Sequence, residues 1–168
     1  MENMIPQIKK ILYATDLSKN SAYAFYYAIH MAKRDEAKIV ILHAVDPLPP
    51  MAIAFEDFVY KVAKDRWEDA AKKIKERIQE FSKKVDAQMG ISSLDLVSNV
   101  IIRLGHPVDE ILKAVDEEGC DVIILGTHGK GFLEQTFLGS VSRSVLLRSQ
   151  KPVFVVPLPS KNTTPDLI

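Results

Sequence analysis

The chain has 168 residues, which is the length of one domain with a full hydrophobic core. Lys plus Arg and Asp plus Glu each number 22, so no net charge favours binding to nucleic acid or to an anionic membrane. The single cysteine, Cys120, excludes an internal disulfide, and no apolar stretch reaches the roughly 18 residues of a membrane span. We therefore expect a cytoplasmic protein whose partner is a small molecule or another protein.

Two apolar runs predict the first two strands. Ile8–Ala14 and Lys38–Val45 carry consecutive rather than alternating apolar residues, which is typical of strands covered on both faces. Between them, Ser18 and Asn20 are candidate caps of a helix that runs to about Ala37. Two such strands joined by one helix predict a right-handed parallel crossover.

A long segment without Gly or Pro follows the proline-rich stretch at residues 46–50. In Phe55–Met89, a stripe of positions that includes Val62, Arg66, Ala70 and Ile74 repeats every three or four residues, which is the period of an α-helix. At 1.5 Å per residue this helix would be about 50 Å long. Because a parallel sheet is narrower than this, the helix either bends near residues 64–66 or projects from the sheet with its first half. Its many charged residues are most simply a solvated face.

The rest of the chain predicts three more strands. Val97–Leu104 is interrupted by polar residues and is expected near a sheet edge, and a helix that starts at residues 105–107 follows it. Asp121–Leu125 and Val153–Val156 are the fourth and fifth strands, on either side of a glycine-rich loop and a helix. The order βαβαβαβαβ predicts an α/β fold, a doubly wound parallel sheet with helices on both faces. We expect one domain at residues 1–158 and a loose tail at 159–168.

The loop after the fourth strand has the composition of a phosphate cradle. Gly126 ends the strand, Gly129 permits a positive φ, and Gly139 lets a ligand approach the backbone at the start of the next helix. Ser140 offers a hydroxyl that could cap this helix or bind a phosphate oxygen. Backbone N–H groups and the positive end of the helix dipole would point the same way. The spacing alone fits ordinary turn glycines equally well, and neither standard phosphate fingerprint is present.

The expected topology brings a second segment to this loop. In doubly wound sheets, ligands bind beyond the carboxyl ends of the strands where the winding reverses, here between the first and fourth strands. These strands end at Thr15-Asp16 and at Gly126-Thr127. Asp16 and the glycine loop should therefore face each other across one cleft, and this convergence favours a nucleotide.

The spacing of Gly126, Gly129, Gly139 and Ser140 resembles the G-2x-G-9x-G-[ST] signature of the ATP-binding branch of the universal stress protein family. The similarity runs in order over nearly the whole chain, because residues 9–16, 41–45, 105–112 and 151–157 resemble further segments of that family. It implies a Rossmann-like fold of the adenine nucleotide hydrolase-like type with strand order 3-2-1-4-5. It also implies a homodimer formed by antiparallel pairing of the edge strand Val153–Val156.

The resemblance further implies a bound adenine nucleotide, ATP or else AMP or ADP, with Mg²⁺ or Mn²⁺. Asp16 would lie near the ribose or a phosphate-bound metal ion, although a helix-capping aspartate is an alternative. The backbone of Ala44 would face the adenine edge. Ala14 and Thr15 would belong to the pocket wall. The ribose and phosphates would be held by Gly126, Gly129, Gly139, Ser140 and Val141, with Leu125 and Thr127 flanking them.

Three functions remain open at this point. The favoured one is a non-catalytic or very slow ATP-dependent switch in the stress response, because no nucleophile, base and metal set is evident. The second is a slow ATP hydrolase or adenylyl-transferring enzyme assisted by His128 or Asp16. The third is a protein-interaction module without nucleotide, against which the glycine and serine pattern counts. Of the other histidines, His43 is expected to be an interior residue and His106 a turn or cap residue.

Overall fold

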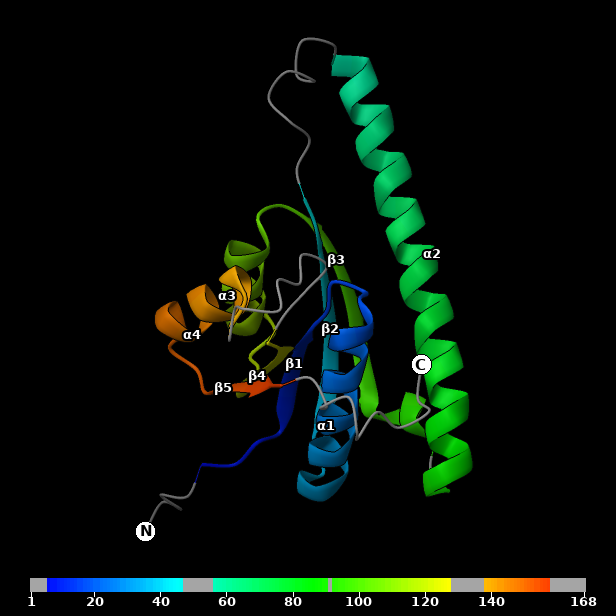
Figure 1. Cartoon of the computed structure of the whole chain (residues 1–168), viewed down its shortest axis with the longest axis vertical. Helices are drawn as coiled ribbons and strands as arrows, with labels where there is room; N and C mark the ends of the chain where they lie inside the picture. Colours follow the sequence, from blue (N-terminus) through cyan, green and yellow to red (C-terminus); the bar gives the residue numbers. More distant parts are fainter. Residues whose placement is uncertain (1–5, 47–55, 91, 128–137, 158–168) are drawn as a thin grey trace.

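The computed structural model describes residues 6–46, 56–90, 92–127 and 138–157 (Figure 1). Its strands form one five-stranded parallel sheet in the order β3-β2-β1-β4-β5, which confirms the predicted fold class and strand order. The elements in chain order are β1 (Lys10–Ala14), α1 (Lys19–Asp35), β2 (Lys38–Val45), α2 (Glu56–Met89), the 3₁₀ turn η2 (Ser93–Leu96), β3 (Val97–Leu104), α3 (Pro107–Glu117), β4 (Val122–Gly126), α4 (Ser140–Arg148) and β5 (Val153–Val156).

Helices cover both faces of the sheet (Figure 1). Alternate residues of the central strands point to opposite faces, so Ile11 packs in the core under α1 and α2 whereas Leu12 packs in the core under α3 and α4. Both side chains are fully buried. Burial on two faces explains why these strands read as continuous apolar runs in the sequence.

Helix α2 is one unbroken helix of 34 residues, so of the two alternatives left open by the sequence, a bend near residues 64–66 or a projecting first half, the structure has the second (Figure 1). Its first half extends past the carboxyl ends of the strands (Figure 1). Further along, Ala70 and Ile74 are buried, and the helix packs against β2, β3 and η2. The opposite side carries exposed ion pairs one turn apart, such as Lys64 with Glu68, which agrees with the predicted solvated face.

The ends of the helices follow local sequence signals. Ser18 is the N-cap of α1, and its Oγ accepts a hydrogen bond of 3.2 Å from the Ser21 N–H. The same helix ends at Asp35, two residues before the predicted end near Ala37, and its C-cap residue Glu36 has a φ of 53°, in the left-handed region. Gly90 after α2 and Gly119 after α3 have φ of 62°, a conformation that glycine adopts without strain.

Among the described residues, every helix is too short or too polar to cross a bilayer. The expected tail at residues 159–168 lies outside the described part of the chain.

Candidate functional site

A cavity of about 410 Å³ opens at the carboxyl ends of β1, β2 and β4, where the winding of the sheet reverses. It is lined by residues from every layer of the fold. The lining residues are Ala14, Thr15, Asp16, Ser21, Leu42, His43, Ala44, Val45, Asp46, Arg66, Pro107, Ile111, Leu125, Gly126, Gly139, Ser140, Val141 and Ser142.

The cavity brings together most of the residues that the sequence singles out. All of them line it except Thr127 and Gly129. Gly129 lies in residues 128–137, outside the described part of the chain, together with His128. Thr127 uses its backbone elsewhere: its N–H donates to the Val156 carbonyl at 2.9 Å, and its carbonyl accepts the Gly139 N–H at 2.7 Å. The second of these bonds ties the end of β4 to the start of α4.

The first turn of α4 forms one wall of the cavity. Gly139, rather than Ser140, is the N-cap of this helix, so the expectation that Ser140 could be the cap is wrong. The amides of Ser140, Val141 and Ser142 belong to the first turn, where N–H groups have no partner within the helix. The φ of Gly139 is −65°, which any residue can adopt, so glycine at this position serves to keep the wall free of a side chain.

Ser142 is a site residue that the sequence analysis missed. Its side chain is buried, and its Oγ donates to the Gly126 carbonyl at 2.7 Å and lies 3.3 Å from the Thr127 carbonyl. These contacts fix the end of β4 against α4. A second hydroxyl two positions after Ser140, within the first helical turn, is the sequence signal that could have identified it.

The opposite wall is built around Thr15 at the end of β1. The Thr15 N–H donates to the Leu42 carbonyl at 2.9 Å, and His43 Nδ1 donates to the Thr15 carbonyl at 2.7 Å. Because a carbonyl can only accept, Nδ1 carries the proton of this ring. His43 is 7% exposed, which confirms the expected interior histidine. Its hydrogen bond sets the position at which the chain leaves β1.

Asp16 lines the cavity in a turn that precedes α1. Its Oδ1 accepts the Ser18 N–H at 3.0 Å, and Thr15 Oγ1 accepts the Leu17 N–H at 3.0 Å. Leu17 has a φ of 63°, so the turn holds a leucine in a region that costs a non-glycine residue energy. The alternative role of Asp16 as the helix cap is wrong, because Ser18 takes that position.

Tyr13 ties β1 to the start of α1, which follows this turn. Its hydroxyl donates to the Ser21 carbonyl at 2.6 Å, and its ring stacks on Phe25 with centroids 4.8 Å apart. Burial raises the pKa of the Tyr13 hydroxyl to about 12. The phenol therefore stays neutral and keeps donating this hydrogen bond at physiological pH.

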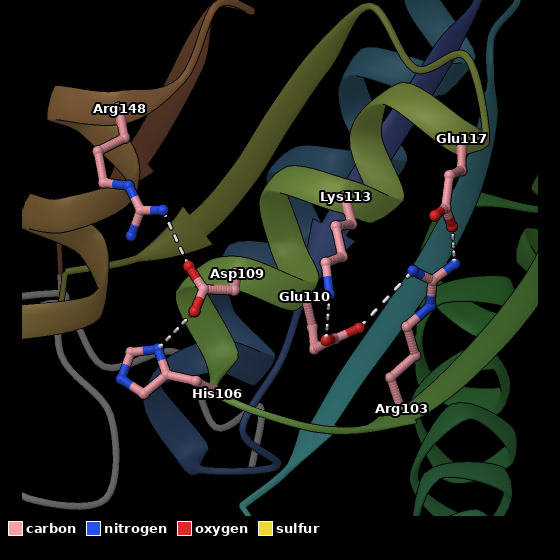
Figure 2. Close-up of polar contacts among 7 residues, drawn as sticks. All are labelled: Arg103, His106, Asp109, Glu110, Lys113, Glu117 and Arg148. Carbon is pink, nitrogen blue, oxygen red and sulfur yellow. Dashed lines mark hydrogen bonds and ion pairs between the residues drawn. The ribbon is translucent and has the colours of Figure 1, made fainter.

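Ion pairs hold α3 beside the cavity (Figure 2). Arg103 at the end of β3 pairs with Glu117 and, at 3.7 Å, with Glu110, whose side chain also lies 3.4 Å from the Lys113 ammonium. A Cβ at Gly105 would lie 2.7 Å from Glu110 Oε1, so a larger residue there would require the Glu110 side chain to move. Ion pairs near the surface contribute roughly 0–1 kcal/mol each, and here they connect β3 to the helix that carries Pro107 and Ile111 into the cavity wall.

A second set of charges joins α3 to α4. Arg148 Nη2 lies 2.9 Å from Asp109 Oδ1, and the other carboxylate oxygen of Asp109 lies 3.9 Å from His106 Nδ1 (Figure 2). His106 is the N-cap residue of α3, although its side chain makes no capping bond. The helix with the first-turn amides is therefore connected to the helix that forms the neighbouring wall.

The described carboxylates on the cavity wall are those of Asp16 and Asp46. The described residues contain no cluster of three or more His, Cys, Asp or Glu side chains that could hold a metal ion. The only described cationic side chain on the wall is Arg66 of α2, which the sequence analysis placed on the apolar stripe of its helix and did not assign to the site.

Comparison with known proteins agrees with this architecture. The profile of the Universal stress protein family matches residues 7–157. The universal stress protein MJ0531 of Methanocaldococcus jannaschii is 31% identical over 156 residues, which cover 91% of this chain and 84% of the relative. The universal stress protein MJ0577 of the same organism is 32% identical over 162 residues, covering 88% of this chain and 94% of the relative.

Solved structures show the same relationship in three dimensions. The structure of MJ0577 superimposes with a TM-score of 0.76 at 30% identity, over 92% of this chain and 99% of that one. The universal stress protein UspA from Lactobacillus plantarum has the same fold, with a TM-score of 0.73 at 21% identity over 90% of this chain and 99% of its own. On the family match, the relatives and the shared sheet order, this chain belongs to the universal stress protein family.

Proposed function

We propose that this protein binds an adenine nucleotide in the cavity, with ATP as the first candidate, and that it acts as a nucleotide-dependent switch in the stress response. The observation that carries this proposal is the first turn of α4, whose amides face a cavity at the point where the sheet winding reverses. The cavity volume of about 410 Å³ lies within the range of small-molecule sites.

The phosphates belong at the α4 end of the cavity. The N–H groups of Ser140, Val141 and Ser142 have no partner within the helix and can donate there, and the helix dipole adds a positive potential. Mg²⁺ or Mn²⁺ would arrive with the phosphates, and Asp16 on the opposite wall supplies a carboxylate of the kind these ions prefer. On this proposal the protein belongs to the ATP-binding branch of its family.

The base belongs at the β2 end. Ala44 lines the cavity there and can offer its backbone to the adenine edge, a contact that does not depend on the side chain. The ribose then lies between the two ends, near Thr15 and Leu125.

Calorimetric titration with ATP and Mg²⁺ tests the proposal. Wild-type protein should bind, and Gly139→Val should weaken binding about tenfold or more, because it puts a side chain where the phosphates approach. A φ of −65° suits valine, so this variant should fold. Ser144→Ala, on the same helix but away from the cavity wall, is the control and should bind as wild type. Absence of binding by the wild-type protein would refute the proposal.

Phosphate and pyrophosphate release, followed in the same solutions, separates a switch from a slow hydrolase or adenylyl-transferring enzyme. The switch predicts that bound ATP stays intact over many hours. Steady release that Asp16→Ala abolishes would assign the cavity to an enzyme instead.

We also propose that the protein forms a homodimer through β5. This strand lies at one edge of the sheet, and Phe154 on it is 40% exposed beside Tyr27 of α1, with ring centroids 5.8 Å apart. An apolar strand with an open edge is a natural surface for pairing with a second chain.

A further inference from the structure

Arg66 occupies an unusual position on α2. It follows the same stripe as Ala70 and Ile74, one and two turns later, which are buried against the rest of the fold. Arg66 is partly buried, and it lines the cavity at the carboxyl ends of the strands. The sequence thus places an arginine on an apolar stripe at a point where that stripe meets the cavity.

Arg66 forms no ion pair with a described residue, although Asp16 and Asp46 line the same cavity. Other cations of α2 pair along the helix, Lys72 with Glu76 at 3.9 Å and Lys73 with Asp69 at 2.5 Å. No described carboxylate lies within 4.0 Å of the Arg66 guanidinium, and no described group accepts a hydrogen bond from it. A partly buried guanidinium facing a cavity is therefore available to a ligand.

The layers of the fold indicate which part of a ligand Arg66 meets. Helix α2 packs on β2 and β3, so Arg66 reaches the cavity from the β2 end, where Ala44 also lies. The amides of α4 lie beyond β1, next to β4. Pro107 and Ile111 of α3 line the cavity from the other face of the sheet. A flat ring at the β2 end would have a guanidinium on one side and apolar side chains on the other.

We propose that Arg66 binds the purine base of the nucleotide by stacking its guanidinium on the ring, and so contributes to base binding rather than to phosphate binding. The inference rests on the proposed function and adds to it a contact from α2, an element outside the glycine loop. Guanidinium groups stack on aromatic faces because the ring presents a negative quadrupole to the cation. Through this contact the long helix gains a direct link to the occupied site.

Three ligands separate the base from the phosphates: adenosine, ATP with Mg²⁺, and inorganic tripolyphosphate with Mg²⁺. Arg66→Ala should lower the affinities for adenosine and for ATP by the same factor, about 3- to 30-fold, and leave the affinity for tripolyphosphate unchanged. Arg66→Met keeps most of the aliphatic stem and should give the same pattern if the alanine variant folds poorly. Circular dichroism confirms the helical content of each variant.

Arg77→Ala is the matched control. Arg77 lies eleven residues further along α2, about three turns, and so on nearly the same side, but it is exposed and away from the cavity wall. Its removal should leave all three affinities unchanged. Loss of ATP and tripolyphosphate binding in Arg66→Ala with adenosine unaffected would make Arg66 a phosphate ligand and overturn the inference. Unchanged affinities for all three ligands in both Arg66→Ala and Arg66→Met would also overturn the inference. A wild-type protein that binds none of the three ligands would instead refute the proposed function itself.

Discussion

Two buried side chains hold the backbone of the site in place. Ser142 donates to the carbonyl of Gly126 at the end of β4, and His43 donates to the carbonyl of Thr15 at the end of β1. A buried carbonyl without a partner costs roughly 1–3 kcal/mol, so each of these side chains both stabilises the fold and fixes a strand end. The two walls of the cavity are therefore positioned before any ligand arrives.

Tyr13 gives the fold a dependence on alkaline pH. Burial raises the pKa of Tyr13 to about 12 in the folded protein, above the value of about 10 in an unfolded chain. Between these values the unfolded chain loses the proton first, so the stabilisation is complete below pH 10 and is lost as the pH rises toward 12. The expected loss approaches about 3 kcal/mol.

Urea unfolding of wild-type protein and Tyr13→Phe between pH 9 and 12 measures this effect. Phenylalanine keeps the stacking on Phe25 but has no proton to lose, and other lysines and tyrosines titrate in both proteins. The wild type should lose stability relative to Tyr13→Phe across this range. Parallel curves for the two proteins would show that the buried hydroxyl does not control the response.

At the scale of whole elements, the helix ends differ in how much strain they hold. Glu36, the C-cap residue of α1, lies in the left-handed region, whereas after α3 this conformation is adopted by Gly119, which tolerates it. A Cβ at Gly119 would meet no atom within 4 Å, so a substitution there changes only the backbone preference. We expect Glu36→Gly to raise the free energy of unfolding by about 0.5–1 kcal/mol and Gly119→Ala to lower it by about 1 kcal/mol.

Chemical denaturation of both variants checks this pair of opposite effects. Glu118→Gly is the control, because Glu118 has a φ of −83° and glycine relieves nothing there. A stabilising effect of Glu118→Gly equal to that of Glu36→Gly would contradict the assignment of strain to the left-handed residue.

The sequence predicts the strands and helix ends that depend on local residues alone. The strands β1, β2 and β4 are buried on both faces and read as continuous apolar runs, and caps such as Ser18 and Gly119 mark helix ends through local backbone chemistry. The form of α2 could not be derived this way, because the same apolar repeat fits a bent helix and a straight one. The choice depends on contacts with β3 that are distant in sequence.

The residues of the candidate site likewise fall into those that the sequence predicts and those that only the folded structure brings together. The glycines and Asp16 could be predicted because strand ends at a winding reversal meet in any doubly wound sheet. Arg66, Ile111 and Ser142 reach the cavity through tertiary packing, and no local motif marks them. Ser140 was misjudged as a possible cap because the N-cap and the next residue cannot be distinguished without backbone angles.

At the scale of the whole molecule, β5 is the edge of the sheet at which we expect a second chain to pair. The carbonyls of Pro152 and Val156 bond to β4, so alternation along β5 turns the backbone groups of Val153 and Val155 away from the sheet. Val155→Pro should therefore block pairing with a second chain without removing a bond to β4. We expect wild-type protein to sediment at twice its chain mass of 18.8 kDa, and this variant to sediment as a monomer.

Leu104→Lys, at the exposed β3 edge, serves as the control for this experiment and should remain dimeric. Sedimentation of wild-type protein at the single-chain mass would contradict the dimer. Dimers that persist in Val155→Pro but dissociate in Leu104→Lys would move the interface to the other edge.

The central claim is that the first-turn amides of α4 hold the phosphates of a nucleotide. Nuclear magnetic resonance of ¹⁵N-labelled protein tests it residue by residue. Addition of ATP with Mg²⁺ should shift the amide signals of Ser140, Val141 and Ser142, and adenosine at saturation should shift them far less while still moving signals near Ala44. ATP binding that leaves these three amides unmoved would contradict the account.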